Sequence, residues 1–262
     1  MLQTLEIECE TGTATIWMNR PDRHNAFDET LIAELAAACA MVDADDSIRV
    51  VVLAGRGKSF SAGADLNWMK RAAGYTVEQN LDDARKLATM LRTLAELRKP
   101  TVARVHGAAL GGGMGLAAAC DICVASTAAT FATSEVRFGL IPATIGPYVL
   151  RAIGARQASR YFLTAERIDA RRAWELGLVH DLVEPNALDA RVREISNALL
   201  AGGPHAQAAA KDLIRAVAGQ PIDDARVEDT ARRIAQIRAM PEAKEGLSAF
   251  LEKRPPNWTV EP

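Results

Sequence analysis

Neither sign of charge dominates this sequence of 262 residues. Its 31 lysines and arginines nearly balance its 33 aspartates and glutamates, which leaves a formal net charge of −2. Proteins that bind nucleic acid carry an excess of cationic side chains that neutralise phosphates. The balance therefore argues against a nucleic-acid partner, including an RNA-binding scaffold, and the lack of a cationic run argues against a membrane surface. Local groups of arginine and lysine can still bind a small polyanion.

The sequence also lacks an apolar run long enough to span a bilayer. Its longest uncharged stretch, residues 107–120, is glycine-rich and shorter than the ~20 apolar residues that a membrane helix needs. We predict a buried turn and helix there. Residues 1–8 contain acidic side chains where a secretory or organellar leader is basic, and no apolar segment follows. These features predict a cytoplasmic chain.

Cysteine and histidine are few, with four of each. Cys120 and Cys123 have the C-x-x-C spacing, but no second pair of ligands stands at a suitable distance, so thiols buried on a strand are favoured over a metal or redox site. No histidine has an acid and a nucleophile at motif spacing, which disfavours a Ser-His-Asp hydrolase built on Ser61. Nor is there a P-loop or a dinucleotide fingerprint. We expect no metal and no separate cofactor.

Short β-rich runs alternate with amphipathic helical segments in the first part of the chain. The predicted strands are residues 14–18, 50–54, 101–105 and 121–125. Helices are predicted at residues 30–42, after a cap at Asp28, and at residues 81–97, which Thr76 and Gln79 introduce with the pattern of a capping box. The alternation predicts an α/β fold, and a hydrophobic content of 49% is ample for a large core.

The pattern changes from about Asp169 onward, where strand-like runs disappear and helices follow one another. The predicted helices are residues 187–200, 204–217, 223–238 and 242–252. A proline precedes or begins each of them, at a position where its missing N–H costs nothing. The chain therefore changes from an α/β pattern to a helical one.

Two glycine-bearing turns stand out because each follows a predicted strand and opens a helical stretch. The first contains Gly63 and Ala64, and the second is Gly111 to Gly113. The first amides of a helix lack internal acceptors and its N-terminus is partly positive, so both turns attract negative charge. If the amides of Ala64 and Gly112 pointed at one thioester carbonyl, they would form an oxyanion hole.

These turns belong to an ordered series of motifs. The series comprises Asn19-Arg20-Pro21, Asn25-Ala26-Phe27, Phe60-Ser61-Ala62-Gly63-Ala64-Asp65-Leu66, Gly107-Ala108-Ala109-Leu110-Gly111-Gly112-Gly113, Cys120-Asp121-Ile122, Phe138-Gly139-Leu140-Ile141-Pro142 and Gly177-Leu178-Val179. In order and spacing it resembles the crotonase (enoyl-CoA hydratase/isomerase) superfamily over nearly the whole chain. The resemblance implies an α/β fold with a spiral of ββα units, which we assign to residues 1–195. It further implies a C-terminal helical region, residues 196–262, that serves trimer assembly. It also implies an acyl-CoA thioester as substrate, with CoA as part of that substrate, and a homo-oligomer that is a trimer or a dimer of trimers.

The resemblance places catalytic carboxylates at two positions. In well-known hydratases of the family, two glutamates share the proton transfers; here the first position is Gly115 and the second is Glu135. We interpret Gly115 as making room for a branched or acidic acyl group, although a helical glycine can also simply permit close packing. Glu135 is the expected acid/base. The alternative for it is a structural ion pair with Arg137.

A single carboxylate leaves two reactions open. It can take a proton from water and return one to the α-carbon on the same face, which hydrates a 2-enoyl-CoA. It can equally move one proton between two carbons, which converts a 3-enoyl-CoA to a 2-enoyl-CoA. The sequence favours the hydratase and keeps the isomerase as the alternative.

Binding residues also follow from the resemblance. Those expected to line the CoA and substrate site are Arg23, Asn25, Ala26, Ala62, Asp65, Leu66, Gly111 and Lys253. Arg23 is the expected phosphate contact, and Lys253 is expected to reach the nucleotide of an adjacent subunit. Asp65 has an alternative role as a helix cap, and Lys253 as a solvated charge.

Within the superfamily, the sequence looks most like methylglutaconyl-CoA and carboxygeranoyl-CoA hydratases of leucine and terpene catabolism. The similarity lies in the glycine at position 115 and in the segments around residues 64–69, 80–84 and 145–149. Such substrates carry a distal carboxylate, for which Asn67, Arg71 and Arg137 are candidate partners. Each of these is individually more typical of a solvated surface residue. Trp68 and Tyr148 are expected to form core or pocket wall.

Overall fold

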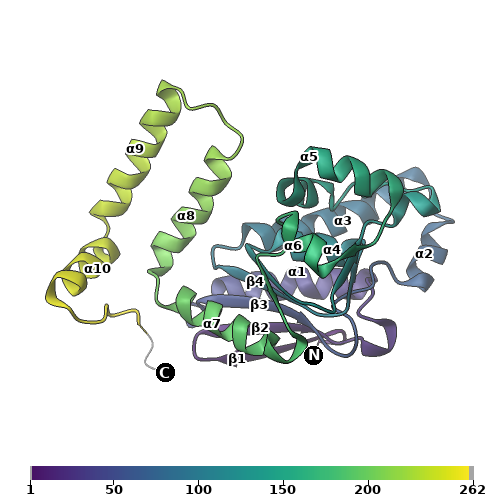
Figure 1. Ribbon diagram of the computed structural model, residues 1–262, viewed down its shortest axis with the longest axis horizontal. Coiled ribbons are helices and arrows are strands. Elements are labelled where there is room, and N and C mark those ends of the chain that lie inside the picture. The colour runs from purple at the N-terminus through teal and green to yellow at the C-terminus, as the bar shows by residue number, and fades with distance from the viewer. Residues whose placement is uncertain (1, 260–262) are drawn as a thin grey trace.

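A six-stranded sheet forms the centre of the molecule in a computed structural model, which describes residues 2–259 (Figure 1). In sheet order its strands are β1 (Leu5–Glu10), β2 (Thr13–Met18), β3 (Val50–Gly55), β4 (Thr101–Val105), β6 (Ile122–Ser126) and β9 (Asp181–Val183). The β1 and β2 strands are antiparallel, and all other neighbours are parallel. A second sheet contains β5 (Ala108–Leu110), β7 (Thr130–Ala132) and β8 (Ile168–Asp169).

Helices cover both faces of the large sheet and extend beyond it. They are α1 (Glu29–Ala44), α2 (Leu66–Ala72), α3 (Val77–Glu96), α4 (Gly112–Ala119), α5 (Gly146–Thr164), α6 (Ala170–Glu175), α7 (Leu188–Leu200), α8 (Pro204–Val217), α9 (Asp224–Ala239) and α10 (Pro241–Glu252). Three short 3-10 helices are η1 (Pro21–Arg23), η2 (Glu135–Phe138) and η3 (Pro185–Ala187).

The β3 strand shows how the core is divided. All six of its residues are buried, and because side chains alternate across a strand, they enter two different clusters. Val51 and Leu53 belong to the larger cluster with α1, α3 and α4. Val50 and Val52 belong to a smaller one, which α7 covers. The parallel strands therefore run between two apolar layers, and their carboxyl ends lead into the turns described below.

The strands and helix starts predicted from local patterns are present. The four predicted strands are found as β2, β3, β4 and β6. Asp28 caps α1, because its carboxylate accepts a hydrogen bond from the amide of Leu31 at 2.9 Å. Thr76 and Gln79 form the predicted capping box at the start of α3, with reciprocal bonds of 2.8 and 3.3 Å.

The expected loss of strands after Asp169 is wrong, because β9 completes the edge of the large sheet beside β6. It contains only three residues, all of them half-buried, which is too short for a periodic pattern to show in the sequence. The predicted boundary at residue 195 also falls inside α7. Val192 and Leu200 of that helix pack in the smaller cluster, so the chain leaves the core only after α7.

Cys120 and Cys123 are buried free thiols. Cys123 lies on β6, as the strand interpretation predicts, whereas Cys120 caps the end of α4. Burial raises the pKa of Cys123 to about 12 and raises the pKa of Cys120 well above its usual range. Both are therefore protonated and behave as small apolar side chains.

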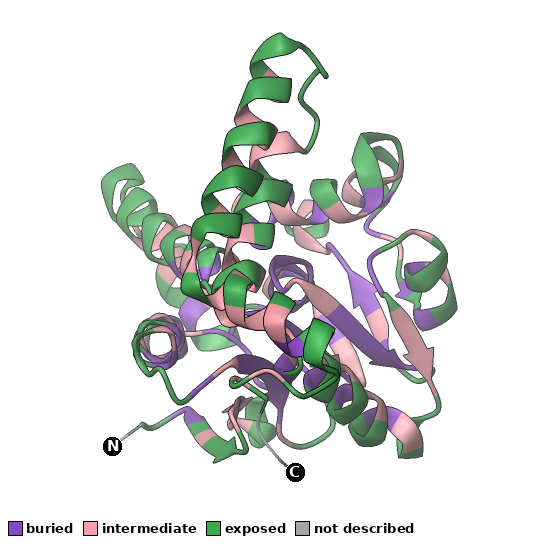
Figure 2. Ribbon diagram, turned by 90° about the vertical axis from the view of Figure 1, so that its left-hand side faces the viewer, coloured by how far each residue is buried: buried purple, intermediate pink, exposed green. Residues whose placement is uncertain are grey.

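The last three helices extend away from the core (Figure 1), and their surfaces are mostly exposed (Figure 2). Lys211 is the buried residue of α8, Ala249 is the buried residue of α10, and α9 has none among the described residues. Lys211 fastens α8 to the core: its ammonium group lies 2.6 Å from the Asp121 carboxylate and donates to the carbonyl of Lys99 at 2.9 Å.

We expect Lys211→Met to lower the free energy of unfolding by about 3 kcal/mol, because it leaves the Asp121 carboxylate without its cation. The effect lies at the low end for a buried pair, since Asp121 retains 30% exposure. Urea denaturation measures it. Adding Asp121→Asn removes the orphaned charge and keeps an acceptor for the amide of Thr101, which binds the carboxylate at 2.8 Å. The double variant should recover part of the loss; equal stability of single and double variants would contradict the prediction.

No helix among the described residues is both long and apolar enough to cross a membrane.

Candidate active site

A parallel β-bridge between Ser61 and Ala109 holds the two glycine turns side by side. The amide of Ser61 donates to Ala108, and the amide of Leu110 donates to Ser61, both at 2.9 Å. Ala64 and Gly112 each lie three residues beyond this bridge. The bridge therefore holds the two turns that carry the predicted donors against each other.

The glycines that precede the donors are in contact. A methyl group on Gly63 would lie 3.8 Å from Cα of Gly111 and only 2.9 Å from the carbonyl oxygen of Leu110. Both glycines have positive φ, +91° and +49°, a conformation that other residues rarely adopt. Glycine is thus required at both positions, by space and by backbone conformation.

Phe27 sets the direction of the Ala64 amide. Its own amide donates to Gly63 at 2.6 Å, and its carbonyl accepts from the amide of Asp65 at 2.8 Å. The Ala64 N–H shares a trans peptide unit with the Gly63 carbonyl, and the two groups point in opposite directions. Because that carbonyl points toward Phe27, the Ala64 N–H points away from Phe27, and Ala64 is exposed.

The Gly112 amide is the first of α4, and the ring of Phe27 lies against it. A methyl group on Gly112 would be 2.3 Å from a ring carbon of Phe27. Within residues 2–259 the amides of Ala64 and Gly112 have no backbone or side-chain acceptor, as expected for a helix N-terminus and an outward-facing turn. Phe27 therefore holds the first turn with its backbone and supports the second with its ring.

Glu135 lies against the same turns, at the start of η2. One carboxylate oxygen, Oε1, is 3.2 Å from the position that a methyl group on Gly111 would take. The other, Oε2, is buried and has no hydrogen-bond partner among the described residues. Burial raises the pKa of Glu135, and only its own backbone amide opposes the shift. In the described part of the chain no ion pair joins Glu135 to Arg137, which removes the structural alternative.

Gly115 does not open space for an acyl group, contrary to our expectation. A methyl group there would lie 2.2 Å from Cγ2 and 2.7 Å from Cβ of Ile145, a side chain that is 2% exposed. The room left by the missing carboxylate is filled by Ile145, so the alternative of close packing is correct. Position 115 therefore packs against an apolar side chain and supplies no second proton carrier.

Gly115→Ala should destabilise the fold by about 1–3 kcal/mol, because it overpacks a filled core site. Ile145→Ala should also destabilise it, by leaving a cavity. The double variant should cost less than the sum of the two, since each change relieves the other. Thermal or urea unfolding of the four proteins measures the coupling, and strict additivity would show that the two side chains do not meet.

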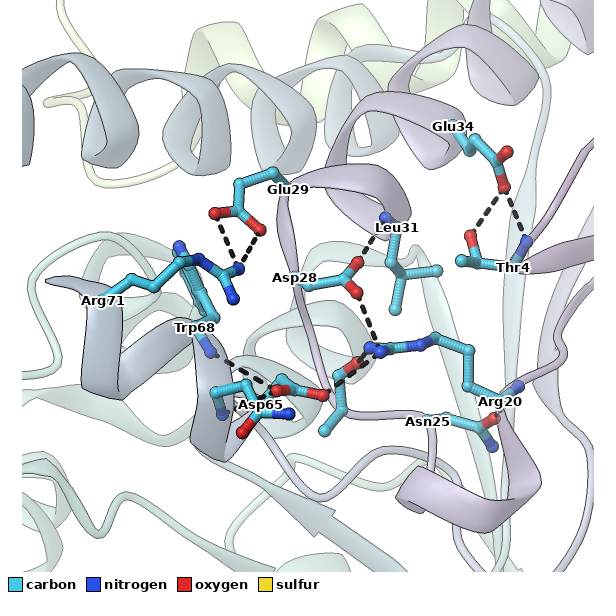
Figure 3. A network of polar contacts seen from close by, with 12 residues as sticks. Thr4, Arg20, Asn25, Asp28, Glu29, Leu31, Glu34, Asp65, Trp68 and Arg71 are labelled. Atoms are coloured by element: carbon cyan, nitrogen blue, oxygen red, sulfur yellow. Dashed lines mark hydrogen bonds and ion pairs between the residues drawn. The ribbon is translucent and has the colours of Figure 1, made fainter.

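Asp65 acts as a helix cap (Figure 3). Its carboxylate accepts from the amides of Asn67 and Trp68 at the start of α2 and lies 3.1 Å from the guanidinium of Arg20. Burial alone would raise its pKa, but these hydrogen bonds and the Arg20 charge hold the pKa of Asp65 below its usual value. Arg20 was not among the predicted site residues. Its partners, Asp28 and Asp65, are distant in sequence, and no local sequence pattern predicts these contacts.

Other predicted binding residues differ in how accessible they are. Asn25 is fully buried; its side-chain amide donates to Arg56 and Ser59 and accepts from the amide of Arg20. Asn25 is expected to line the CoA site, but its buried side chain uses its polar atoms to hold the turn and is not free to contact CoA. Ser61 is also buried, with its hydroxyl donating to Asn25 at 2.8 Å, and it is not available as a nucleophile.

Arg23 and Leu66 are exposed near the first turn, Ala62 is half-buried and Ala26 is buried. Lys253 is exposed at the end of α10, at the opposite end of the molecule from α2 (Figure 1). It cannot reach the Ala64 turn of its own chain.

The three residues predicted to bind a distal carboxylate of the substrate differ in whether they are free to do so. Arg71 is already paired with Glu29 at 2.7 Å, whereas Asn67 and Arg137 are exposed. Trp68 is buried and donates to Asp83 at 3.3 Å, and Tyr148 is half-buried against the larger core cluster. These two aromatic residues belong to core or wall, as predicted.

The chain belongs to the enoyl-CoA hydratase/isomerase family, whose model matches residues 8–261. It therefore has the α/β crotonase fold with a helical C-terminal region and comes from a family of enzymes that act on acyl-CoA thioesters. The crystal structure of an enoyl-CoA hydratase from Shewanella pealeana superimposes with a TM-score of 0.95 at 44% identity, covering 98% of this chain and 96% of that one.

Relatives of this chain include both hydratases and isomerases of CoA thioesters. The short-chain-enoyl-CoA hydratase of Clostridium acetobutylicum is 33% identical over 259 residues, 97% of this chain and 96% of the relative. The 1,2-epoxyphenylacetyl-CoA isomerase of Escherichia coli is 31% identical over 262 residues, 99% of each chain.

Proposed function

We propose that this protein hydrates a 2-enoyl-CoA thioester. The observation that carries the proposal is the Glu135 carboxylate. Within residues 2–259 it is half-buried, has one oxygen without a hydrogen-bond partner, and lies against Gly111, the residue before the free amide of Gly112. A carboxylate with a raised pKa next to preorganised amide donors suits proton transfer at a carbon beside a thioester carbonyl.

The proposed reaction proceeds through an enolate. The hydroxyl oxygen of water adds to the β-carbon while Glu135 takes the remaining proton of that water. The electrons of the double bond move to the thioester oxygen, where the amides of Ala64 and Gly112 stabilise the negative charge. Glu135 then returns a proton to the α-carbon on the same face, which restores the carboxylate and completes the addition of one water molecule.

We further propose a branched acyl group with a distal carboxylate, such as 3-methylglutaconyl-CoA. Arg137 supports this proposal because it is exposed, lies two residues after Glu135 and has no ion pair within residues 2–259. Asn67 is a second polar candidate at the start of α2. The space at Gly115 does not contribute, because Ile145 fills it.

An isomerase remains the second candidate, and one observation favours it. Ile145 fills the space that a carboxylate at position 115 would take, so Glu135 is left to carry the proton by itself. A single proton carrier is sufficient to move a double bond. The reaction would take a proton from the α-carbon of a 3-enoyl-CoA and deliver one to the γ-carbon through the same enolate.

A panel of acyl-CoA thioesters tests both proposals. A hydratase removes the absorbance of a conjugated enoyl thioester, whereas an isomerase creates it from a 3-enoyl-CoA. Within the panel, a carboxylated branched substrate is compared with an uncharged substrate of the same shape. We expect kcat/KM to favour the carboxylated one, and Arg137→Gln to reduce that preference about tenfold, the effect of ~1.4 kcal/mol. No preference in the unaltered protein would remove the distal carboxylate from the proposal.

We also propose that the chain assembles as a trimer or a dimer of trimers. The C-terminal helices and the link between α8 and α9 expose large apolar side chains, including Ile222 at 91%, Phe250 at 79% and Leu251 at 70%. Exposed apolar groups in such numbers are typical of an interface. Sedimentation at micromolar concentration should give a mass of three or six chains, and a stable monomer would contradict this. In such an assembly Lys253 would approach a neighbouring subunit.

A further inference from the structure

Arg20 joins the starts of two helices (Figure 3). Its guanidinium lies 2.8 Å from the carboxylate of Asp28 and 3.1 Å from that of Asp65, and the three side chains are 16%, 20% and 6% exposed. Each aspartate divides its oxygens: Oδ1 caps its helix, and Oδ2 faces Arg20. One guanidinium thus binds both caps at once.

The same guanidinium also contacts the backbone beside the first glycine turn. Its Nη1 donates to the carbonyl of Ala26, the residue before Phe27. Asp65 is the residue after Ala64, and its amide donates to Phe27. Arg20 therefore contacts both segments of the bridge that joins Phe27 to Ala64, one at Ala26 and the other at Asp65.

We propose that Arg20 is a positioning residue that holds the Ala64 amide at its working angle. The Ala64 N–H lies in the peptide unit whose carbonyl, that of Gly63, accepts from Phe27. The next peptide unit ends at Asp65, whose side chain Arg20 binds. Charged hydrogen bonds in a partly buried site are stronger and more rigid than neutral ones. Displacement of a catalytic group by about 1 Å can cost about 100-fold in rate. The inference rests on the proposed role of the Ala64 amide as an oxyanion donor.

Asp28 and Asp65 offer a matched pair of variants. Asp28→Asn and Asp65→Asn each keep an oxygen that can cap the helix and each remove one carboxylate from Arg20, but only Asp65 adjoins Ala64. We expect Asp65→Asn to lower kcat by about 10- to 100-fold, with KM changed less than twofold, and Asp28→Asn to lower kcat less than threefold. Arg20→Gln should resemble Asp65→Asn. Arg20→Lys, which keeps the charge but not the fork, should fall between Arg20→Gln and the unaltered protein.

A binding measurement distinguishes a misoriented Ala64 amide from a general loss of folded structure. Acetoacetyl-CoA forms an enolate whose oxygen needs the amide donors, whereas butyryl-CoA has the same chain length and forms none. Calorimetric titration should show that Asp65→Asn weakens acetoacetyl-CoA at least tenfold and butyryl-CoA less than twofold. Equal weakening of both thioesters, or equal effects of the two aspartate variants, would overturn the inference.

The binding ratio does not depend on turnover. If the unaltered protein hydrates none of the enoyl-CoA panel, the proposed function fails, while the ratio for the two thioesters still supports or overturns the positioning role of Arg20.

Discussion

Replacing Glu135 with glutamine should lower kcat by at least about 100-fold. Glutamine is nearly the same size and keeps the packing against Gly111, but it cannot accept and return a proton. Steady-state turnover of the best substrate in the acyl-CoA panel measures the loss. Glu166→Gln is the control, because that glutamate is exposed and paired with Arg160 on the surface; it should retain full activity. Unchanged turnover in Glu135→Gln would remove this carboxylate from the mechanism.

The pH dependence gives a second signature of Glu135. Since the ionised form accepts the proton from water, kcat/KM should fall as the pH decreases through the pKa of Glu135, which burial places above the usual value of 4.5. The residual activity of Glu135→Gln should not show this fall at low pH.

The pH dependence of stability has the opposite sign. A carboxyl group whose pKa is raised by folding stabilises the fold at low pH, and that contribution is lost as the pH rises through its folded pKa. Glu135→Gln should therefore weaken the decline of unfolding free energy with pH.

Replacing Gly112 with proline should reduce kcat by about 100- to 1000-fold, the usual cost of one oxyanion donor. Proline has no amide hydrogen, yet its backbone suits the first position of a helix, which Gly112 occupies. The control is Gly112→Ala, which keeps the N–H. Both variants place a Cβ against the ring of Phe27, so the clash with Phe27 is common to both.

The comparison between the two Gly112 variants isolates the amide. We expect Gly112→Ala to be the more active by at least about tenfold, at similar thermal stability. If alanine and proline reduce turnover equally, the loss comes from the clash with Phe27 and the amide at position 112 is not a donor to the substrate.

Local signals predicted much of the fold. The caps at Asp28 and Thr76 were recognisable because each hydrogen bond spans three residues. The strands that became β3 and β4 were evident from their apolar runs, since both faces of each strand are buried. β9 was not predicted, because its three half-buried residues are extended through pairing with β6 and have no strand pattern of their own.

The candidate site was predictable only in part. The two glycine turns and Glu135 were evident as motifs, and the structure brings them together. The roles of Asn25 and Gly115 were predicted wrongly, because each role depends on the neighbouring residues in the fold. The side chain of Asn25 forms hydrogen bonds with neighbouring backbone groups, and Gly115 packs against Ile145.

By itself the sequence determined the composition, the helix caps, the β-rich runs and the two turns with their glycines, because these depend on contacts within a few residues. Tertiary structure alone decided how those parts meet. The bridge from Ser61 to Ala109 joins the two turns that carry the amides, Arg20 binds carboxylates 8 and 45 residues away, and burial raises the pKa of Glu135. Each of these depends on atoms that only the folded chain brings within a few ångströms, where desolvation and directed hydrogen bonds become strong.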